Sequence, residues 1–232
     1  MKSKLSKLAI VTVICAYRWW FANSHVDWHV TQELLKDVNT SGVGYNYLPI
    51  HASLNILLFL ILFKQPQLVQ LAIRKRRADI VNEFGGQAVL NSLLFSAVIV
   101  TVNIGFNIVH FGWSNLVEFH FFLVTLLYAF GLWLFYLLAG LTYLNMLALL
   151  SNQFLAVFAT FLLGLILAFL QMILNLPTPL LLVTSYERFY SVAGLDLLAD
   201  SLRNLSALIF AALLFSLLRF IYQRKDILNE SN

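Results

Sequence analysis

The residues His25, Asp27 and His29 alternate along the chain and are the first whose types could bind a metal ion. On an extended strand, residues two apart point to the same face, so two imidazoles and one carboxylate would converge there. The surrounding residues 23–47 otherwise have the polar composition of an ordinary solvated loop. We therefore interpret these three residues as part of a solvated loop and predict no metal site.

The pair His51 and Asn55 has a spacing of four residues, which places both side chains on one face of a helix. This pair resembles the His-x-x-x-Asn of rhomboid intramembrane proteases, and residues 112–115 (Gly-Trp-Ser-Asn) resemble their Gly-x-Ser-Gly turn. A Ser–His dyad there requires a histidine on a late span, but every histidine of this chain precedes residue 121. We therefore interpret His51 and Asn55 as helix-contact residues and keep rhomboid-like proteolysis as an alternative.

Other catalytic motifs are missing from the sequence. It contains no Gly-x-x-x-x-Gly-Lys phosphate loop and no His-Glu-x-x-His metalloprotease helix. The single cysteine, Cys15, excludes an internal disulfide and a cysteine-based zinc site. We therefore predict that the chain is not an enzyme and has no cofactor of its own.

The composition is that of a membrane protein. Of 232 residues, 60% are hydrophobic and 11% are charged, and the mean hydropathy is +0.81. A soluble domain has about 25% charged residues. No Asp, Glu, Lys or Arg occurs between Glu118 and Glu187, a stretch long enough for two membrane crossings. The net charge of +4 does not indicate nucleic-acid binding, because the cations lie at the ends of apolar segments.

The apolar segments predict one all-α integral membrane domain over residues 1–232 with six transmembrane helices. The expected spans cover about 6–22, 46–63, 89–110, 119–141, 153–174 and 205–222. Most Lys and Arg residues fall in loops on one side of this arrangement, which predicts that both termini are cytoplasmic. The first span is expected to be an uncleaved signal anchor, with Arg18 reaching the outer surface. Residues 142–152 are expected to form a tight inner turn, and 175–204 a re-entrant or interfacial outer hairpin.

Two of these spans carry polar or small residues at intervals of four, seven and four, with Gly164 as the small residue of the second set, and this spacing places each set in one stripe of its helix. Polar side chains do not face lipid cheaply, so the stripes are expected to face the bundle interior. They could line a translocation path, or serve only in helix packing. The candidate path residues are Ser92, Ser96, Asn103, Asn107, Thr160, Gln171 and Asn175.

The loop at residues 64–88 is the most polar stretch between two apolar blocks and contains four consecutive cations. If residues 67–84 are helical, Val69, Ile73, Ile80 and Phe84 form one apolar stripe. Such a helix could lie on anionic headgroups, or it could dock into a groove on a partner protein. A lipid anchor alone does not explain the two acidic residues of this loop, so we prefer docking combined with surface anchoring.

The layout of the chain resembles the permease subunits of ABC type-2 exporters of the bacterial peptide, bacteriocin and drug efflux or immunity type. The features that carry the resemblance are the basic start, the His-Ala-Ser-Leu-Asn opening of the second span, the loop LAIRKRRADIVNEFGG and the closing Tyr-Gln-Arg-Lys-Asp-Ile-Leu. The resemblance covers nearly the whole chain. The uncharged second inner turn departs from better-known members of the family.

The resemblance implies a permease in a bacterial plasma membrane, working with a second permease subunit and surrounded by lipid. A separate cytoplasmic ATPase would bind ATP and Mg²⁺, and a coupling helix at about Leu68 to Phe84 would sit in a cleft of that ATPase. The implied coupling residues are Val69, Ile73, Arg74, Lys75, Arg76, Arg77, Asp79, Ile80, Glu83 and Phe84. The substrate would be a peptide or an amphipathic compound. The alternatives are a stand-alone membrane immunity or peptide-binding protein and a secondary transporter.

Overall fold

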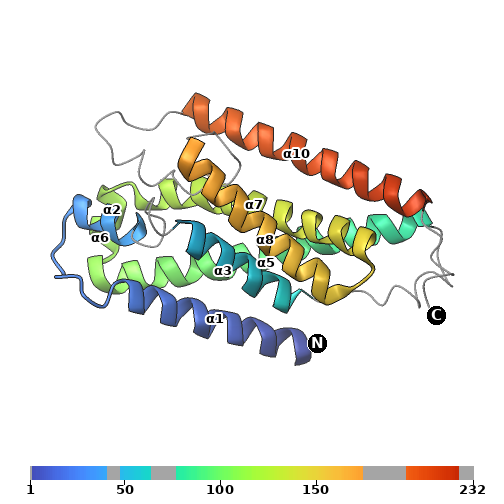
Figure 1. The fold of residues 1–232 in the computed structure, drawn as a ribbon. Coiled ribbons are helices and arrows are strands. Elements are labelled where there is room, and N and C mark those ends of the chain that lie inside the picture. The colour runs from blue at the N-terminus through green and yellow to red at the C-terminus, as the bar shows by residue number, and fades with distance from the viewer. Residues whose placement is uncertain (1, 41–47, 64–76, 175–196, 225–232) are drawn as a thin grey trace.

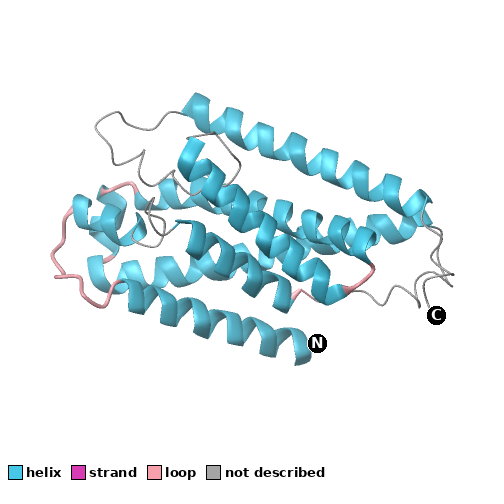
Figure 2. Cartoon of the chain, in the orientation of Figure 1, coloured by secondary structure: helices cyan, strands magenta, loops and turns pink. Residues whose placement is uncertain are grey.

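The computed structural model describes residues 2–40, 48–63, 77–174 and 197–224, and these residues form helices joined by short loops (Figures 1 and 2). The all-α prediction is confirmed for this part of the chain. The helices are α1 (Lys2–Ala22), α2 (Gln32–Thr40), α3 (Leu48–Leu62), α5 (Arg77–Phe111), α6 (Trp113–Glu118), α7 (Phe121–Leu150), α8 (Gln153–Leu174) and α10 (Leu197–Arg224).

Four of the described helices, α5, α7, α8 and α10, are long and apolar enough to cross a membrane, so the chain has the helices of a multi-pass membrane protein. Helix α3 has 15 residues, about 22 Å at 1.5 Å per residue, which is shorter than a hydrocarbon core of about 30 Å. Helix α1 carries Lys2, Lys4, Lys7 and Arg18, which lower its apolar character.

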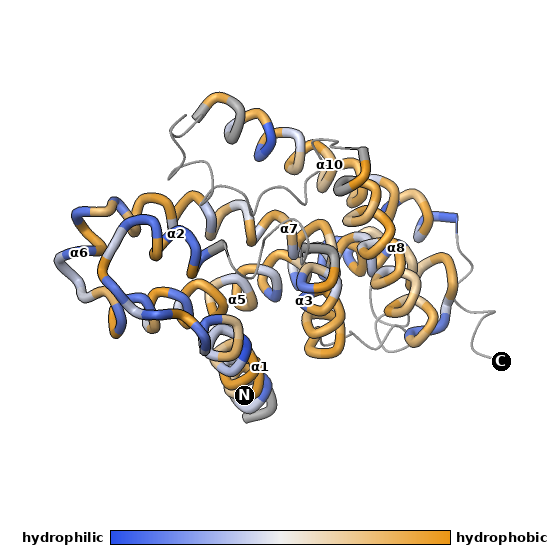
Figure 3. Tube along the Cα trace, turned by 60° about the vertical axis from the view of Figure 1, so that its left-hand side comes forward, coloured by the Kyte–Doolittle hydropathy of each residue, from blue (hydrophilic) through white to orange (hydrophobic). Residues whose placement is uncertain are grey.

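Helix α7 is the centre of the bundle. It packs against α3, α5, α8 and α10, and 61% of its most apolar segment is buried, against 22–28% for the other three long helices. Helices α1 and α10 lie on opposite sides of the bundle, and hydrophobic residues run along the long helices (Figures 1 and 3). Large exposed side chains on α8 and α10, such as Phe154 at 79% and Leu213 at 60%, fit contact with lipid.

The two ends of the bundle differ in charge. The start of α1, the start of α5, the turn between α7 and α8 and the end of α10 lie at one end, while α2 and α6 lie at the other (Figure 1). The first end, which we call the basic end, carries Lys2, Lys4, Lys7, Arg77, Arg219 and Arg224 together with Asp79 and Glu83. The opposite end carries Asp27, Glu33, Asp37, Glu118 and Asp200 together with Lys36 and Arg203.

Two expected boundaries are wrong. Residues 142–150 do not form a turn but continue α7, because the segment is apolar and contains no helix breaker. The connection is only Ser151, with φ 54°, and Asn152, whose Oδ1 accepts hydrogen bonds from the backbone N–H of Phe154 and Leu155 at 2.9 and 3.2 Å. The loop 23–47 also contains a helix, α2. Of the expected hairpin at 175–204, residues 175–196 lie outside the described residues, whereas residues 197–204 are not part of a separate hairpin but form the first turns of α10, continuous with the last expected span.

Helix α5 also differs from the expectation. It begins at Arg77 and passes through Gly85 and Gly86 without a break, so the described part of the expected coupling helix is continuous with the third span. At 35 residues the helix is about 52 Å long, so its first turns extend beyond a hydrocarbon core at the basic end.

Gly85 allows α5 and α10 to approach closely. A Cβ built at Gly85 would lie 2.5 Å from Cε2 of Phe215, whereas one built at Gly86 has nothing within 4 Å. We expect Gly85→Ala to lower the free energy of unfolding by about 1–3 kcal/mol, because the Phe215 ring must move out of a packed crossing. Gly86→Ala, the matched control, should be neutral or stabilising by up to about 1 kcal/mol. Unfolding of the detergent-solubilised protein by denaturant measures both, and equal effects would contradict the close crossing.

Candidate functional site

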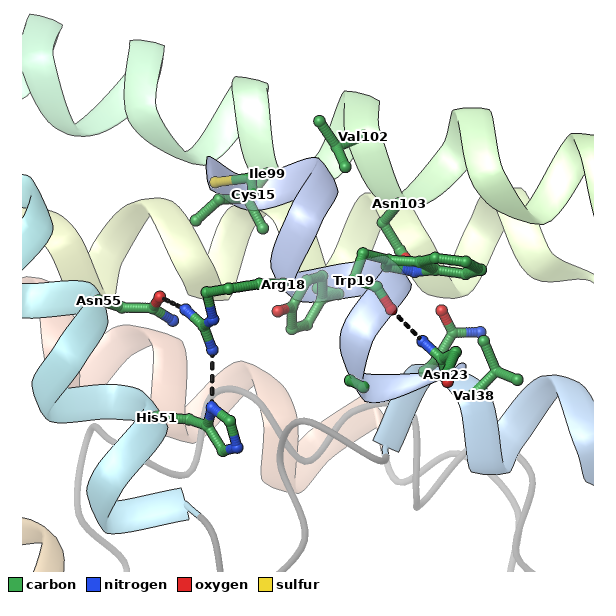
Figure 4. Close-up of a pocket in the computed structure, with 13 residues that line it drawn as sticks. Cys15, Arg18, Trp19, Asn23, Val38, His51, Asn55, Ile99, Val102 and Asn103 are labelled. Carbon is green, nitrogen blue, oxygen red and sulfur yellow. Dashed lines mark hydrogen bonds between the residues drawn. The ribbon is translucent and has the colours of Figure 1, made fainter. Parts of the chain in front are cut away.

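Arg18 lies inside the bundle and not at the outer surface as expected. Its Nη1 donates a hydrogen bond to Oδ1 of Asn55, and its Nη2 lies 2.8 Å from Nδ1 of His51 (Figure 4). The interpretation of His51 and Asn55 as helix-contact residues is confirmed. The correction for Arg18 has a physical reason: α3 supplies two acceptors one helical turn apart, and a partly buried guanidinium requires acceptors in place of water.

The contact with Arg18 fixes the state of His51. A guanidinium only donates hydrogen bonds, so Nδ1 of His51 must accept and cannot carry a proton in this arrangement. The imidazole is therefore neutral, and so is the Asn55 amide. Among the described residues, Arg18 therefore forms hydrogen bonds only with neutral groups.

A second polar group links α1, α2 and α5. Nε1 of Trp19 donates to Oδ1 of Asn103 at 2.9 Å, and Nδ2 of Asn107 donates to the same oxygen at 2.9 Å. Nδ2 of Asn107 also lies 3.2 Å from Oδ1 of Asn39. This network places Asn103 and Asn107 in the interior, as the stripe in their span predicted.

Aromatic rings cover the network at the end that carries α2 and α6. The Trp19 ring stacks on Phe106 with centroids 4.4 Å apart, and Trp28 stacks on His110 at 3.8 Å. Trp19 and Trp28 are themselves stacked at 6.0 Å. The stack attaches the loop before α2 to the last turns of α5 and so holds α1 against α5.

Between these two groups lies a cavity of about 140 Å³. Its lining comes from α1, α2, α3, α5, α7 and the residue after α1, and Figure 4 shows Arg18 between His51 and Asn55 on one side of it. The lining residues are Cys15, Arg18, Trp19, Ala22, Asn23, Val38, Asn39, His51, Asn55, Ile99, Val102, Asn103 and Tyr128. Arg18 is the only charged residue among them, and none is acidic.

We expect Trp19→Phe to lower the free energy of unfolding by about 1 kcal/mol, because the phenyl ring keeps much of the stacking but cannot donate to Asn103. Trp20→Phe is the matched control, since Trp20 is 57% exposed and should change stability by no more than about 0.5 kcal/mol. Unfolding curves in detergent measure both variants. If the two substitutions had the same effect, the indole hydrogen bond would contribute nothing.

Three of the other predicted path residues, Ser92, Ser96 and Thr160, do not line this cavity. Ser92, Ser96 and Thr160 are buried, and their hydroxyls donate to backbone carbonyls of their own helices at 2.8–3.0 Å. Their burial agrees with the stripes facing the interior, and their bonding fits helix packing. Gln171 lies in the last turn of α8, and Asn175 lies outside the described residues.

The predicted coupling residues fall into two groups. Val69, Ile73, Arg74, Lys75 and Arg76 lie outside the described residues. Arg77, Asp79, Ile80, Glu83 and Phe84 form the first turns of α5, where Asp79 is exposed while Ile80 and Phe84 are each 1% exposed. The Phe84 ring packs against Tyr222 of α10 with centroids 5.7 Å apart. In this arrangement two residues of the apolar stripe contact the chain's own core, and docking to a partner stays a prediction.

The predicted solvated loop has internal contacts of its own. Nδ1 of His29 lies 2.9 Å from the backbone oxygen of Asp27, and no group of three potential metal ligands occurs among the described residues. Ser114 is an exposed residue of the short helix α6.

Comparison with known proteins identifies no relative: no family model, no curated protein and no solved structure matches the chain. The site therefore rests on its own geometry. Reasoning from the sequence overlooked the cavity residues Trp19, Asn23, Asn39 and Tyr128. A usable signal was present for Arg18, because a charged residue within an apolar segment usually faces the interior of a bundle.

Proposed function

We propose that the chain is the permease subunit of an ABC type-2 exporter in a bacterial plasma membrane. It would move a peptide or amphipathic compound across the membrane, and a separate ATPase subunit would bind and hydrolyse ATP. In this proposal α1 and α3 join the four long apolar helices as membrane crossings, and a second permease subunit completes the path.

The observation that carries the proposal is the difference in charge between the two ends of the bundle. The end of α3 and the start of α5, between which the run of four cations begins in the sequence, lie at the end that holds Lys2, Lys4, Lys7, Arg219 and Arg224. Positive residues in short loops stay in the cytoplasm, so this connection would be available to a cytoplasmic ATPase. The polar cavity lies towards the other end, where an exporter would release its substrate.

Association with the ATPase tests the proposal. The chain is co-expressed with a candidate ABC ATPase subunit, and the complex is purified in detergent. We expect Arg76→Glu to reduce recovery of the ATPase about tenfold or more, because it reverses a charge in the connecting segment. Lys36→Glu, a charge reversal in α2 at the opposite end, is the matched control and should leave recovery unchanged. Equal recovery with both variants would contradict the coupling role.

The orientation is tested separately. A cysteine introduced at Arg76 in a Cys15→Ser background should be inaccessible to an impermeant thiol reagent in intact cells and accessible in inverted vesicles. Labelling of intact cells would place the cation-rich segment outside and remove the basis of the proposal.

A second candidate function is a stand-alone immunity protein that binds a toxic peptide. It is favoured by the burial of Ile80 and Phe84 against the chain's own helices, which leaves less apolar surface for an ATPase. Cells that express this chain without any ABC ATPase partner distinguish the two functions. Resistance that persists in these cells supports sequestration, and resistance that is lost supports export.

A further inference from the structure

Arg18 carries a positive charge that the described residues do not neutralise. Its two partners, His51 and Asn55, are neutral, and no acidic residue lines the cavity in which its guanidinium lies. Removing a charge from water costs several kcal/mol unless an opposite charge or sufficient hydrogen bonds compensate it. Most arginines inside membrane proteins face a partner or a polar pathway for this reason.

The other polar groups of the cavity do not supply an anion. Nδ2 of Asn23 donates to the backbone oxygen of Trp19 at 2.9 Å, and Nδ2 of Asn39 donates to that of Leu35 at 2.7 Å. Oδ1 of Asn103 already accepts from two donors. A guanidinium has five N–H donors, and the Arg18 guanidinium forms only two hydrogen bonds among the described residues. Donors therefore remain for an acceptor that enters the cavity.

We propose that this cavity binds the oxyanion of an amphipathic ligand, a carboxylate or a phosphate, against Arg18. His51 and Asn55 hold the guanidinium in place, and hydrogen bonds from a guanidinium to an oxyanion are about twice as strong as those between neutral groups. Val38, Ile99 and Val102 supply apolar contacts beside the charge. The volume of about 140 Å³ admits the charged group and a few attached atoms, so the rest of the ligand extends out of the cavity.

The oxyanion could come from a free carboxylate, such as the end of a peptide, or from the phosphate of a lipid headgroup. Both present the same chemistry to Arg18. The binding step does not depend on the proposed function, but the role of the bound group as part of a transported substrate rests on it.

Isothermal titration of the full chain in dodecyl maltoside, a detergent without charge, tests the inference. The soluble probes are N-acetyl-leucine and N-acetyl-leucinamide, which differ only in the carboxylate. The lipid probes are dioleoyl phosphatidylglycerol and dioleoylglycerol, which differ in the phosphate headgroup. We expect at least one anionic probe to bind about tenfold or more tightly than its neutral counterpart.

Each outcome has a defined meaning. Preference for N-acetyl-leucine alone identifies a free carboxylate as the source, and preference for phosphatidylglycerol alone identifies a lipid headgroup. Absence of a preference in both pairs overturns the proposal. The titration needs no ATPase, so its result is independent of an export assay. If the anionic probe binds but no export is found, only the permease function is refuted. If export is found but no anionic probe binds, only the proposed oxyanion site is refuted.

Two variants locate the binding at Arg18. Arg18→Gln should remove the preference for the anion, because the amide keeps a donor but loses the charge. Asn55→Asp keeps Arg18 and supplies a carboxylate within the chain, so it should also remove the preference while leaving the fold intact. If Asn55→Asp bound the anionic probe as tightly as the natural chain, Arg18 would not be the binding group.

Discussion

Replacing Phe84 by alanine is expected to lower the free energy of unfolding of the isolated chain by about 3 kcal/mol. The Phe84 ring is 1% exposed and meets Tyr222 edge-on, with an interplanar angle of 64°. Removing it leaves a void where α5 and α10 cross, and neighbouring Phe215 cannot fill that void without leaving Gly85. Lipid lowers the hydrophobic part of this cost, but the lost packing remains. Denaturant unfolding in detergent, without any partner protein, measures the change.

Leu90→Ala is the matched control for Phe84→Ala. Leu90 lies on the same helix and is 49% exposed, so its truncation should change stability by no more than about 0.5 kcal/mol. The comparison also separates two roles for Phe84. If Phe84 were a docking residue for an ATPase, its removal would leave the isolated chain as stable as Leu90→Ala and would affect only the recovery of the complex.

The general plan of the fold followed from the sequence because lipid imposes strong rules on helices. Apolar runs identified the four described helices that are long and apolar enough to cross a membrane, and regular spacing correctly predicted that Ser92, Ser96, Asn103 and Asn107 face the interior. The helix boundaries were predicted less accurately, because an apolar sequence contains few residues that indicate where a helix ends. Helix α7 ends at Ser151, whose backbone is in the left-handed conformation. The expected boundary between the loop at 64–88 and the span from 89 is absent, because α5 continues through Gly85 and Gly86, and Gly85 permits close packing on Phe215.

The candidate site was less predictable because its residues come from separate helices. The spacing of His51 and Asn55 placed them on one face, but nothing in the sequence indicates that this face meets α1. The same holds for Trp19, whose partner Asn103 is 84 residues away along the chain. Arg18 lies close to the end of α1, where a long side chain can either reach the surface or turn inward, and only the acceptors on α3 decide between these.

Asn107→Leu is expected to lower the free energy of unfolding by about 2 kcal/mol. Asn107 is fully buried, and its Nδ2 contacts the backbone oxygen of Asn103 at 2.8 Å, Oδ1 of Asn103 at 2.9 Å and Oδ1 of Asn39 at 3.2 Å. Leucine has a similar volume, so packing is conserved while the buried acceptors lose a donor. Hydrogen bonds between helices in lipid contribute about 0.6 kcal/mol on average and up to about 1.7, so the effect requires the loss of several.

Asn115→Leu is the control for Asn107→Leu. Among the described residues, Nδ2 of Asn115 donates only to the backbone oxygen of Phe111 in the preceding turn, at 2.7 Å, and the loss of this hydrogen bond should cost less than about 1 kcal/mol.

A double-mutant cycle that combines Asn107→Leu with Trp19→Phe then tests whether the network acts as a unit. Trp19 and Asn107 donate to the same oxygen of Asn103, so each single variant removes one of these two donors, and the double variant removes both. We expect the double variant to lose more stability than the sum of the single variants, because the donor that remains in each single variant keeps the buried oxygen hydrogen-bonded. Strict additivity would mean that the Asn103 oxygen is hydrated when one donor is lost, and the interior at this point would then be open to water.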